Sequence, residues 1–412
     1  MKFQPLAIIT LALLLLLLLS ACAGKEPGQA EMPYPPSPEP QVGDILHIPT
    51  GYYVSQEQLL ANVRPFPLVY VGELHDNPAS HRLQLAVLKA MVKANPGQVA
   101  LGMEMFTTGQ QGVLDRWRAG ELTEKEFLRA TKWFTEGWQF DFQLYREILL
   151  FCRDQQVPLI ALNVDKELAR QVSMTPLAEM DDELKAQLPE MDLADPYQGA
   201  MVAAVMAGHS GSDKMLASFQ RRQTLWDETM AQSVAHYLKE NPGKQMLVMA
   251  GGWHVNYGFG IPRRVFRRLP RPYTIIASRT IKVAEGKEPQ LMDITLPRFP
   301  MPEAHYLAFH EYELLESEEV RLGVLLGEND GGPGVRLAGV MPGSVAQEAG
   351  LAKDEILLAI DGEEVGEVFD VVYAVKQKRV NETASLLVQG LKGEQRTLTI
   401  TFAANSKPHH GR

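Results

Sequence analysis

A short apolar segment that ends in a cluster of polar residues is the strongest constraint on how this chain folds. Residues 68–71 read Leu-Val-Tyr-Val, which are β-branched and aromatic side chains, and Gly72 follows them. Glu73 and His75 come next, and a helical pattern of apolar residues begins at Ala79. This order predicts a strand, a turn and a helix. In open parallel α/β sheets the ligand crevice lies outside the carboxyl ends of the strands, so Glu73 and His75 are candidate site residues.

Two later strand-like segments end in the same way. One leads directly into Glu104, and another, at 246–250, leads through two glycines and a tryptophan into His254. Parallel strands present their carboxyl ends at one edge of a sheet, so we expect Glu104 and His254 beside Glu73 and His75. Two imidazoles and two carboxylates suit Zn, Fe or Mn, and without a metal they could serve as general acid and base. Alternatively, the two histidines only bond to loops and cap strand ends.

Strand-like and helical segments alternate along the first part of the chain. Further strands are expected at 98–103, 157–162 and 273–277, and helices at 79–94, 110–117, 124–133, 142–153 and 213–238. This alternation predicts an α/β domain, with a mainly parallel sheet flanked by helices. Residues 168–207 are rich in methionine and lack clear strands, which predicts an α-helical insertion of about 165–240 once the long helix is included. His81, in the first helix, is expected to face solvent or to cap the first turn.

The region after residue 300 has a different pattern. Prolines between 296 and 310 mark a boundary, and 273–277 is expected to be the last strand of a first domain spanning 43–300. From residue 314 to 403, short strands alternate with Gly and Asp turns around one helix, which predicts a small α+β domain.

Length and charge limit the classes of function. The chain has 412 residues, enough for two domains, and a formal net charge of −10. That charge would repel a phosphate backbone, and no Lys/Arg stripe stands out, so nucleic acid is not an expected partner. Cys152 lies in an apolar helical pattern and is expected to be a buried small hydrophobe.

The N-terminus has the features of a bacterial lipoprotein signal. An uninterrupted apolar segment, 6–19, is too short for a comfortable membrane span and has signal-peptide proportions. The four residues ending in Cys22 match the lipobox, which predicts removal of 1–21 and a lipid on Cys22. A Pro-rich tether, 22–42, follows. Ala23, in place of Asp, favours the outer membrane, facing the periplasm. A plain secretory signal or a membrane anchor is the alternative.

The C-terminal domain resembles a PDZ domain of the bacterial type. The matching segments are Leu322-Gly323-Val324-Leu325, residues 340–346, residues 349–351 and residues 354–362. The resemblance implies that a peptide or protein C-terminus binds as an added strand, with its carboxylate held by backbone N–H groups of Leu322, Gly323, Val324 and Leu325. Lys353 stands where the family usually has glycine. A PDZ fold used only for packing or dimerisation is the alternative, and residues 404–412 form a tail.

The first domain resembles the ChaN-type haem-binding lipoproteins of the Tiki superfamily. The matching motifs are Gly72-Glu73-Leu74-His75-Asp76, Gly102-Met103-Glu104-Met105-Phe106, Trp226-Asp227-Glu228-Thr229-Met230-Ala231 and Gly251-Gly252-Trp253-His254-Val255. The resemblance implies haem binding in haem or iron uptake, with tyrosine ligation at a paired-haem dimer interface. The insertion offers Tyr197, Met206 and His209 as axial ligands, and the alternative for Tyr197 is an exposed turn residue. Since no C-x-x-C-H sequence exists, covalent haem attachment is excluded.

Three functions follow from these resemblances. The first is a lipid-anchored haem-binding protein whose PDZ domain holds a protein partner. The second is a metal-dependent hydrolase, because Tiki relatives include peptidases and an esterase-like branch. In that enzyme Glu73, His75, Glu104 and His254 would hold a metal or activate water. The third is a scaffold in which the PDZ domain is the main functional part.

Overall fold

The structure is a computed structural model that describes residues 39–206, 213–283, 294–315, 320–330 and 332–403. The expected signal peptide and Cys22 lie outside these residues, as does nearly all of the expected tether. None of the described helices is both long and apolar enough to cross a membrane.

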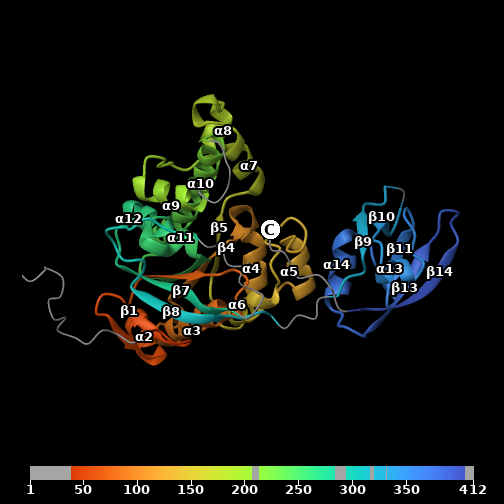
Figure 1. The fold of residues 1–412 in the computed structure, drawn as a ribbon, viewed down its shortest axis with the longest axis horizontal. Coiled ribbons are helices and arrows are strands. Elements are labelled where there is room, and N and C mark those ends of the chain that lie inside the picture. The colour runs from red at the N-terminus through yellow and green to blue at the C-terminus, as the bar shows by residue number, and fades with distance from the viewer. Residues whose placement is uncertain (1–38, 207–212, 284–293, 316–319, 331, 404–412) are drawn as a thin grey trace, which may run out of the picture. The chain divides into compact units, whose positions relative to one another are not determined.

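A mostly parallel sheet organises the first domain. Its strands are β1 (Ile45–His47), β2 (Tyr52–Val54), β3 (Leu68–Glu73), β4 (Val99–Thr107), β5 (Leu159–Asn163), β6 (Gln245–Gly251), β7 (Tyr273–Val283) and β8 (Tyr306–Tyr312). Within the described residues these eight strands run in the order β2-β1-β8-β7-β3-β6-β4-β5 (Figure 1). The pairs from β5 to β8 are parallel, and β1 and β2 add an antiparallel edge. The predicted α/β fold class is confirmed.

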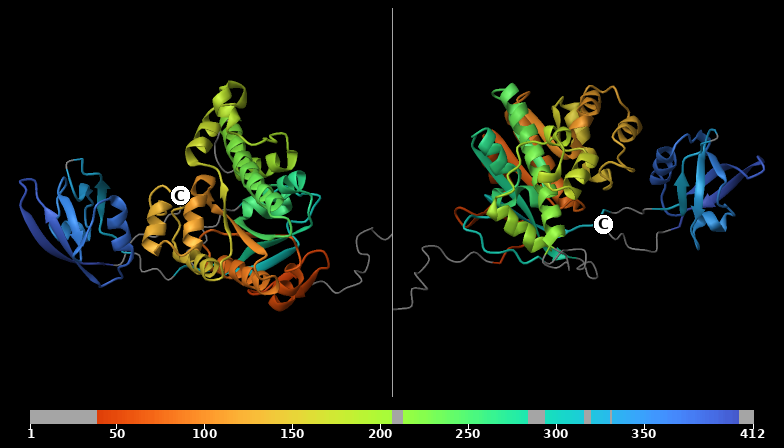
Figure 2. Two further views of the ribbon diagram at one scale, coloured as in Figure 1. Left: turned by 180° about the vertical axis from the view of Figure 1, so that it is seen from behind. Right: turned by 90° about the horizontal axis from the view of Figure 1, so that it is seen from above.

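Helices cover both faces of this sheet (Figure 2). They are α2 (Gln56–Val63), α3 (Pro78–Ala94), α4 (Gln111–Arg118), α5 (Glu124–Ala130), α6 (Gln143–Asp154), α7 (Lys166–Met174), α8 (Asp182–Ala186), α9 (Pro196–Met206), α10 (Asp213–Glu240), α11 (Gly252–Val255) and α12 (Ile261–Arg268), with 3₁₀ turns η1 (Thr108–Gln110), η2 (Leu177–Glu179) and η3 (Asn256–Gly258). Successive strand residues point to opposite faces. In β3, Val69 and Val71 therefore enter one core with α2 to α6, and Leu68 and Tyr70 enter a second core with α10 and α12.

The predicted insertion is helical and lies between β5 and β6. Asp165 is the N-cap of its first helix, α7, and its carboxylate accepts hydrogen bonds from the N–H groups of Glu167 and Leu168. Residues of α7 and α10, among them Val172 and Leu225, form a small core of their own. In Figure 1, α7, α8 and the adjoining part of α10 extend away from the sheet.

The first sheet continues past the expected boundary. Residues 273–277 begin β7, but β7 is not the last strand of the first domain. The strand β8 pairs in parallel with it, with Ile276 opposite Tyr306. The prolines at 297, 300 and 302 lie in the connection that leads to β8. The apolar residues of β8 form a strand because they pair with the edge of β7, and local sequence does not reveal this long-range pairing. With three residues each, β1 and β2 are too short to show a period-two pattern.

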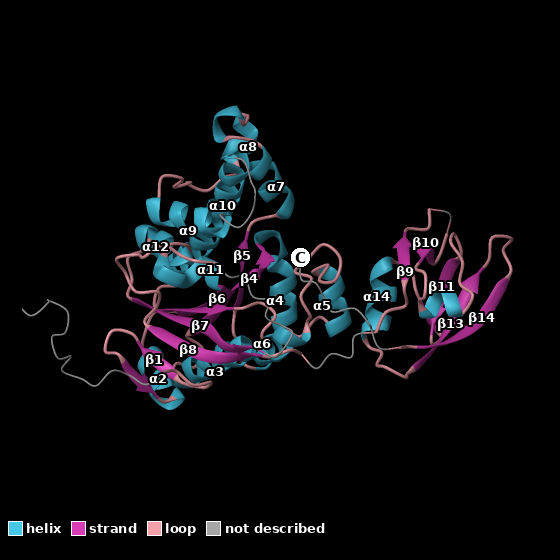
Figure 3. Ribbon diagram, in the orientation of Figure 1, coloured by secondary structure: helices cyan, strands magenta, loops and turns pink. Residues whose placement is uncertain are grey.

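The C-terminal domain has its own sheet and core (Figure 3). Its strands are β9 (Val324–Gly327), β10 (Val335–Val340), β11 (Ile356–Ile360), β12 (Glu363–Glu364), β13 (Thr383–Gln389) and β14 (Gln395–Thr401), and its helices are α13 (Val345–Glu348) and α14 (Val368–Lys376). The strand order among the described residues is β14-β13-β11-β10-β9, with β12 beside β11. This antiparallel sheet matches the predicted small α+β domain, and β9 forms one edge of it.

Candidate functional site

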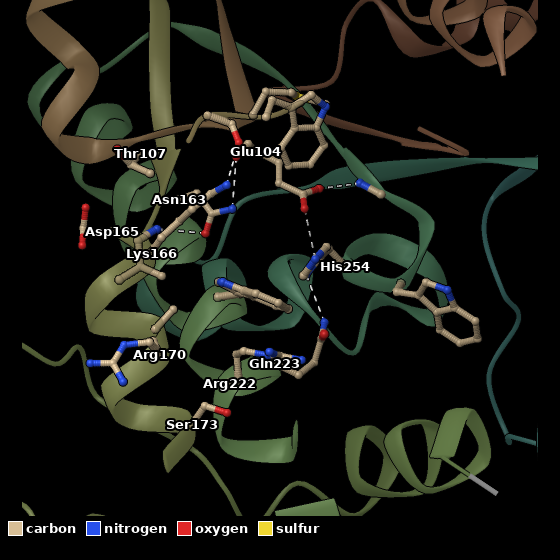
Figure 4. A pocket seen from close by; sticks show the side chains of 18 of the residues that line it. Glu104, Thr107, Asn163, Asp165, Lys166, Arg170, Ser173, Arg222, Gln223 and His254 are labelled. Carbon is tan, nitrogen blue, oxygen red and sulfur yellow. Dashed lines mark hydrogen bonds and ion pairs between the residues drawn. The ribbon is translucent and has the colours of Figure 1, made fainter. Parts of the chain in front are cut away.

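A cavity of about 1290 Å³ lies where strand ends of the first sheet meet the helical insertion. Its walls include His75 and His254, which follow strands β3 and β6, and Glu104, which lies within β4 because that strand continues past the expected end at residue 103 to Thr107. Residues of α7, α9 and α10 complete the walls. Figure 4 shows His254 and Glu104 on one side and side chains of α7, such as Arg170, on another. This volume exceeds the roughly 300–1,000 Å³ typical of small-molecule pockets, so the cavity can accept a large ligand.

Glu73, at the end of β3, gathers three donors although it is buried. Its Oε1 lies 2.7 Å from Nδ1 of His75 and accepts a 2.9 Å bond from the hydroxyl of Tyr145, and its Oε2 accepts a 2.7 Å bond from the amide of Gln84. Burial by itself would raise the pKa of Glu73. The nearby rings of His81 and His75, with the bond from Gln84, outweigh that effect and lower the pKa. Glu73 is therefore a fixed negative charge that orients His75.

The expectation that His81 faces solvent or caps the helix is wrong. The ring is buried, with Nε2 3.0 Å from the carbonyl oxygen of His75 and Nδ1 3.0 Å from the side-chain oxygen of Gln84. The first turn of α3 packs directly against the polar end of β3, so His81 and Gln84 point inward to Glu73. Their i, i+3 spacing on one helix face is the sequence signal that could have shown this.

His254 lies between two carboxylates. Its Nδ1 is 2.6 Å from Oδ1 of the fully buried Asp227, and its Nε2 is 3.3 Å from Oε1 of Glu104. Gln223 also reaches Nδ1, at 3.1 Å, and the N–H of Gly251 donates to Glu104 at 2.7 Å. Asp227 was part of a recognised motif, but its role was not anticipated because it is 27 residues from His254 in the sequence.

This arrangement fixes the protonation state of His254. Burial opposes its charge, but Glu104 and Asp227 raise its pKa to about 10. Burial opposes ionisation of Glu104, but His254 outweighs this effect, with help from His75 and the N–H of Gly251. Together they lower the pKa of Glu104 to about 2. At neutral pH this pKa favours the imidazolium form of His254, so a metal at this nitrogen would have to displace a proton.

The four predicted site residues do come together. A Cβ placed on Gly251 would lie 2.8 Å from Cε1 of His75 and 3.6 Å from Oε2 of Glu104, so the pairs Glu73–His75 and Glu104–His254 meet over this glycine. Glu73 lies behind His75 and does not line the cavity. Across the described ranges, no group of three His, Cys, Asp or Glu side chains is arranged to hold a metal ion.

Two of the three residues predicted as haem ligands, Tyr197 and Met206, do not line this cavity. Tyr197, at the start of α9, stacks on Phe259 with ring centres 5.2 Å apart and borders a smaller depression beside Arg263. Among the described residues, neither Tyr197 nor Met206 lines the large cavity, and His209 lies outside the described residues. Their role as haem ligands therefore stays a prediction.

A cation on α10 was missed by the sequence analysis. The guanidinium of Arg222 lines the cavity and lies over the rings of Phe219 and Trp226, at 5.3 and 5.1 Å from their centres. Burial lowers the pKa of Arg222. Within the described part of the chain, its Nε is buried without a hydrogen-bond partner, and no carboxylate forms an ion pair with its guanidinium. The spacing i, i+3, i+7 of Phe219, Arg222 and Trp226 places them on one helix face, which is the signal that could have found it.

A second cation, Lys166, lies at the start of α7 on the same cavity. Its ammonium donates a 2.6 Å hydrogen bond to the carbonyl of Gly137, and burial lowers the pKa of Lys166 against the attraction of Glu136. Arg170 also lines the cavity, but it is bound by Glu167 at 2.6 Å. Two partly desolvated cations thus face a cavity that apolar and polar side chains line together.

In the C-terminal domain, the four predicted peptide-binding residues lie at the start of β9. Gly323 has a φ of +79°, and a Cβ there would lie 2.2 Å from Cβ of Ser344, so glycine is required for both reasons. Leu322 is buried, whereas Leu325 is 60% exposed. Since β9 ends the strand order of the described residues, its outer edge is available to an added strand.

Comparisons with known proteins identify both domains. Residues 59–265 match the family described as haem-binding uptake, Tiki superfamily, ChaN, and residues 336–390 match a PDZ domain. No curated protein matches the chain. Among solved structures, ChaN of Campylobacter jejuni with cofacial haem is 13% identical, with a TM-score of 0.48 over 64% of this chain and 95% of that one.

Two proteases resemble only part of the chain. The HtrA-type protease AlgW with a decapeptide is 22% identical over 22% of this chain and 30% of that one, with a TM-score of 0.21. The photosystem II D1 C-terminal processing protease is 22% identical over 21% of this chain and 24% of that one, with a TM-score of 0.19. This chain thus spans less than a third of either protease.

The match to the ChaN family covers half of this chain and confirms the resemblance noted in its motifs. The protein belongs to the ChaN family of haem-binding uptake proteins of the Tiki superfamily, and a PDZ domain follows its ChaN domain.

Proposed function

We propose that the large cavity of the first domain binds haem, and that the protein is a lipid-anchored haem acceptor in haem or iron uptake. Haem is a broad apolar plane with two carboxylates at one edge. The observation that carries the proposal is Arg222, a partly desolvated guanidinium with no carboxylate partner among the described residues, on the wall of a cavity of about 1290 Å³. An anionic ligand would supply the missing partner.

The cavity walls suit the two halves of this ligand. Apolar side chains from the insertion, including Met201, Val202 and Trp226, line it and can pack on the macrocycle. Arg222 and Lys166 would hold the propionates, since a guanidinium binds a carboxylate through two parallel hydrogen bonds. When haem is bound, its iron can also bind an axial ligand from the protein.

Haemin titration followed by absorbance tests this proposal. Wild-type protein should sharpen and shift the Soret band, and Arg222→Gln should weaken binding by about 10-fold or more, because a hydrogen bond to a charged group contributes about 1.5–3 kcal/mol. The control Arg116→Gln removes an exposed cation that pairs with Glu121 and does not line the cavity, so it should bind like wild type.

A modified ligand makes the test more specific. Haemin dimethyl ester lacks free propionates, so the Arg222→Gln variant and the wild type should bind it with similar affinity. An unchanged Soret band with wild-type protein refutes haem binding. A variant that binds haemin as tightly as wild type refutes the assignment of Arg222.

The lipid anchor at Cys22 is the second part of the proposal. Its support is the lipobox that ends at Cys22 and the proline-rich segment behind it. Cys22→Ala should leave the protein soluble or unprocessed, while the wild type fractionates with membranes and, by the residue after the cysteine, with the outer membrane. Equal partition of the two proteins would contradict the anchor.

For the PDZ domain we propose that a peptide or protein C-terminus binds along β9. The support is the position of β9 at the edge of the sheet among the described residues and the positive φ of Gly323 just before that strand. The full-length protein should select peptides with a free carboxylate from a library and bind their amidated forms at least about 10-fold more weakly, since charge-assisted hydrogen bonds are lost. If no peptide is selected, the domain serves packing or dimerisation.

A further inference from the structure

The edge strand β9 of the C-terminal domain carries a large apolar side chain that faces solvent. Leu325 is 60% exposed although it lies within the strand. The residues on either side of it, Val324 and Leu326, are partly buried and pack on the core of the domain. Successive side chains of a strand point to opposite faces, so Leu325 lies on the face that turns away from this core. The packing of the domain therefore does not account for a leucine at this position.

The neighbouring strand β10 does not cover Leu325. Gly339 lies opposite it in the register of the two strands, and a Cβ on Gly339 would lie 3.2 Å from Cδ1 of Leu325. The pairing continues beyond β10, because the N–H of Met341 donates a 2.9 Å hydrogen bond to the carbonyl of Gly323. Met341 is two residues after Gly339, so the alternation of side chains places it on the face of Leu325, and it is 51% exposed. Leu325 and Met341 thus form an exposed apolar surface beside the start of β9.

Charged groups bound this apolar surface at its other end. The next residue of β9 on the same face is Gly327, and Arg336 lies opposite it. A Cβ on Gly327 would lie 3.1 Å from a terminal nitrogen of Arg336, whose guanidinium also pairs with Asp354 at 3.0 Å. A strand added beside β9 would therefore meet apolar surface at one position of this face and charged groups at the next position.

The direction of the bound peptide decides which of its side chains meets Leu325. The proposed carboxylate site begins at Leu322, at the start of β9, so the peptide runs antiparallel to β9 with its last residue beside Val324. Its penultimate residue then lies beside Leu325, and directly opposite residues of two paired strands share one face. We infer that Leu325, flanked by Met341, selects a large apolar side chain at the penultimate position of the bound C-terminus. The partner is thus a protein whose last residue follows a leucine or an aromatic residue. This inference rests on the proposed peptide binding and names a residue that sets its specificity.

The test uses full-length protein and a library of peptides with a free carboxylate and four randomised C-terminal residues. The selected peptides should be enriched in leucine, phenylalanine or tryptophan at the penultimate position. Replacing that residue by serine in one selected peptide should weaken binding about 5-fold in fluorescence anisotropy, because a cross-strand apolar pair contributes up to roughly that factor. In Leu325→Ser the same replacement should have no effect.

Leu391→Ser is the matched control. Leu391 is 74% exposed and lies in the turn between β13 and β14, at the opposite edge of the sheet from β9 in the order of the described strands. This variant also replaces an exposed leucine by serine, and it should keep the wild-type preference. If it loses the preference as fully as Leu325→Ser, the effect is not local to β9 and the inference is wrong.

The outcomes separate this inference from the proposed peptide binding. If no peptide of the library binds more tightly than its amidated form, the proposed binding fails. If peptides are selected through their carboxylate without an apolar preference at the penultimate position, the binding stands and the inference is wrong. A preference that persists in Leu325→Ser also overturns it. Should Leu325→Ser fail to fold, the affinities of wild-type protein for the leucine and serine forms of the peptide decide.

Discussion

Asp227→Asn tests whether the charge of His254 is held in place by buried carboxylates. The substitution keeps the size of the side chain and removes its negative charge. In the wild type Asp227 is fully buried, and its Oδ1 lies 2.6 Å from Nδ1 of His254. The variant leaves the imidazolium with Glu104, 3.3 Å away, as its remaining carboxylate partner among the described residues.

Two estimates of the cost agree. The environment raises the pKa of His254 from 6.5 to about 10, and at 1.36 kcal/mol for each pKa unit this corresponds to about 5 kcal/mol of preference for the charged ring. Because burial opposes this shift, Glu104 and Asp227 together contribute at least this much, and the part due to Asp227 is roughly 2–3 kcal/mol or more. Breaking a buried ion pair costs about 3–5 kcal/mol. We expect a loss of about 3 kcal/mol in the free energy of unfolding.

Thermal unfolding followed by tryptophan fluorescence measures this loss. All 5 tryptophans lie in the first domain, between residues 117 and 253, so the signal reports that domain. A loss of about 3 kcal/mol should lower Tm by about 6–12 °C. The control is Glu240→Gln, which removes the carboxylate 3.3 Å from His236 in a pair that is 70% and 62% exposed, and it should change Tm by less than about 2 °C.

The pH dependence supplies the refuting result. Because the folded pKa of His254 lies above its unfolded value of 6.5, this stabilisation is complete below 6.5 and is lost as the pH rises through about 10. The difference in Tm between wild type and Asp227→Asn should therefore be larger at pH 7 than at pH 10.5. If Asp227→Asn and Glu240→Gln behave alike at pH 7, the buried pair does not hold His254 charged.

Three further outcomes are expected. Gly260→Ala should destabilise the first domain by about 1–3 kcal/mol in urea unfolding, because a Cβ there would lie 2.2 Å from the carbonyl oxygen of His254; Gly112→Ala, with nothing within 4 Å, should be neutral or stabilising, and equal effects would contradict the packing argument. Cys152, buried and with its thiol pKa raised by that burial, should react with a thiol reagent in denaturant but not in the native protein, and fast native labelling would refute the expected burial. Acid should destabilise the domain as the pH falls from 4.5 towards 2, because the stability that the lowered pKa of Glu104 adds is complete above 4.5 and is lost through that range. In Glu104→Gln this part of the acid sensitivity should disappear, and an unchanged acid profile would argue against the ion pair.

Much of the fold and the location of the site follow from local sequence. The periods of two and 3.6 residues reflect the geometry of strands and helices, so the core strands and long helices were found within a few residues of their bounds. The glycines at 72 and 251 mark strand ends, and parallel strands bring those ends to one edge. Glu73, His75, Glu104 and His254 were therefore predicted as a cluster, and the structure brings them together.

The chemistry of each side chain was decided by tertiary structure. Whether His254 is charged depends on Asp227 and Glu104, which lie 27 and 150 residues away in the sequence, and whether Arg222 lacks a partner depends on every segment that surrounds it. His81 turned inward because Glu73 lies beneath its helix turn, and β8 joined the sheet because β7 offered an open edge. Local patterns report which face of an element is apolar, but burial, ionisation and pairing depend on the distances between atoms of remote segments, and only the folded chain sets those distances.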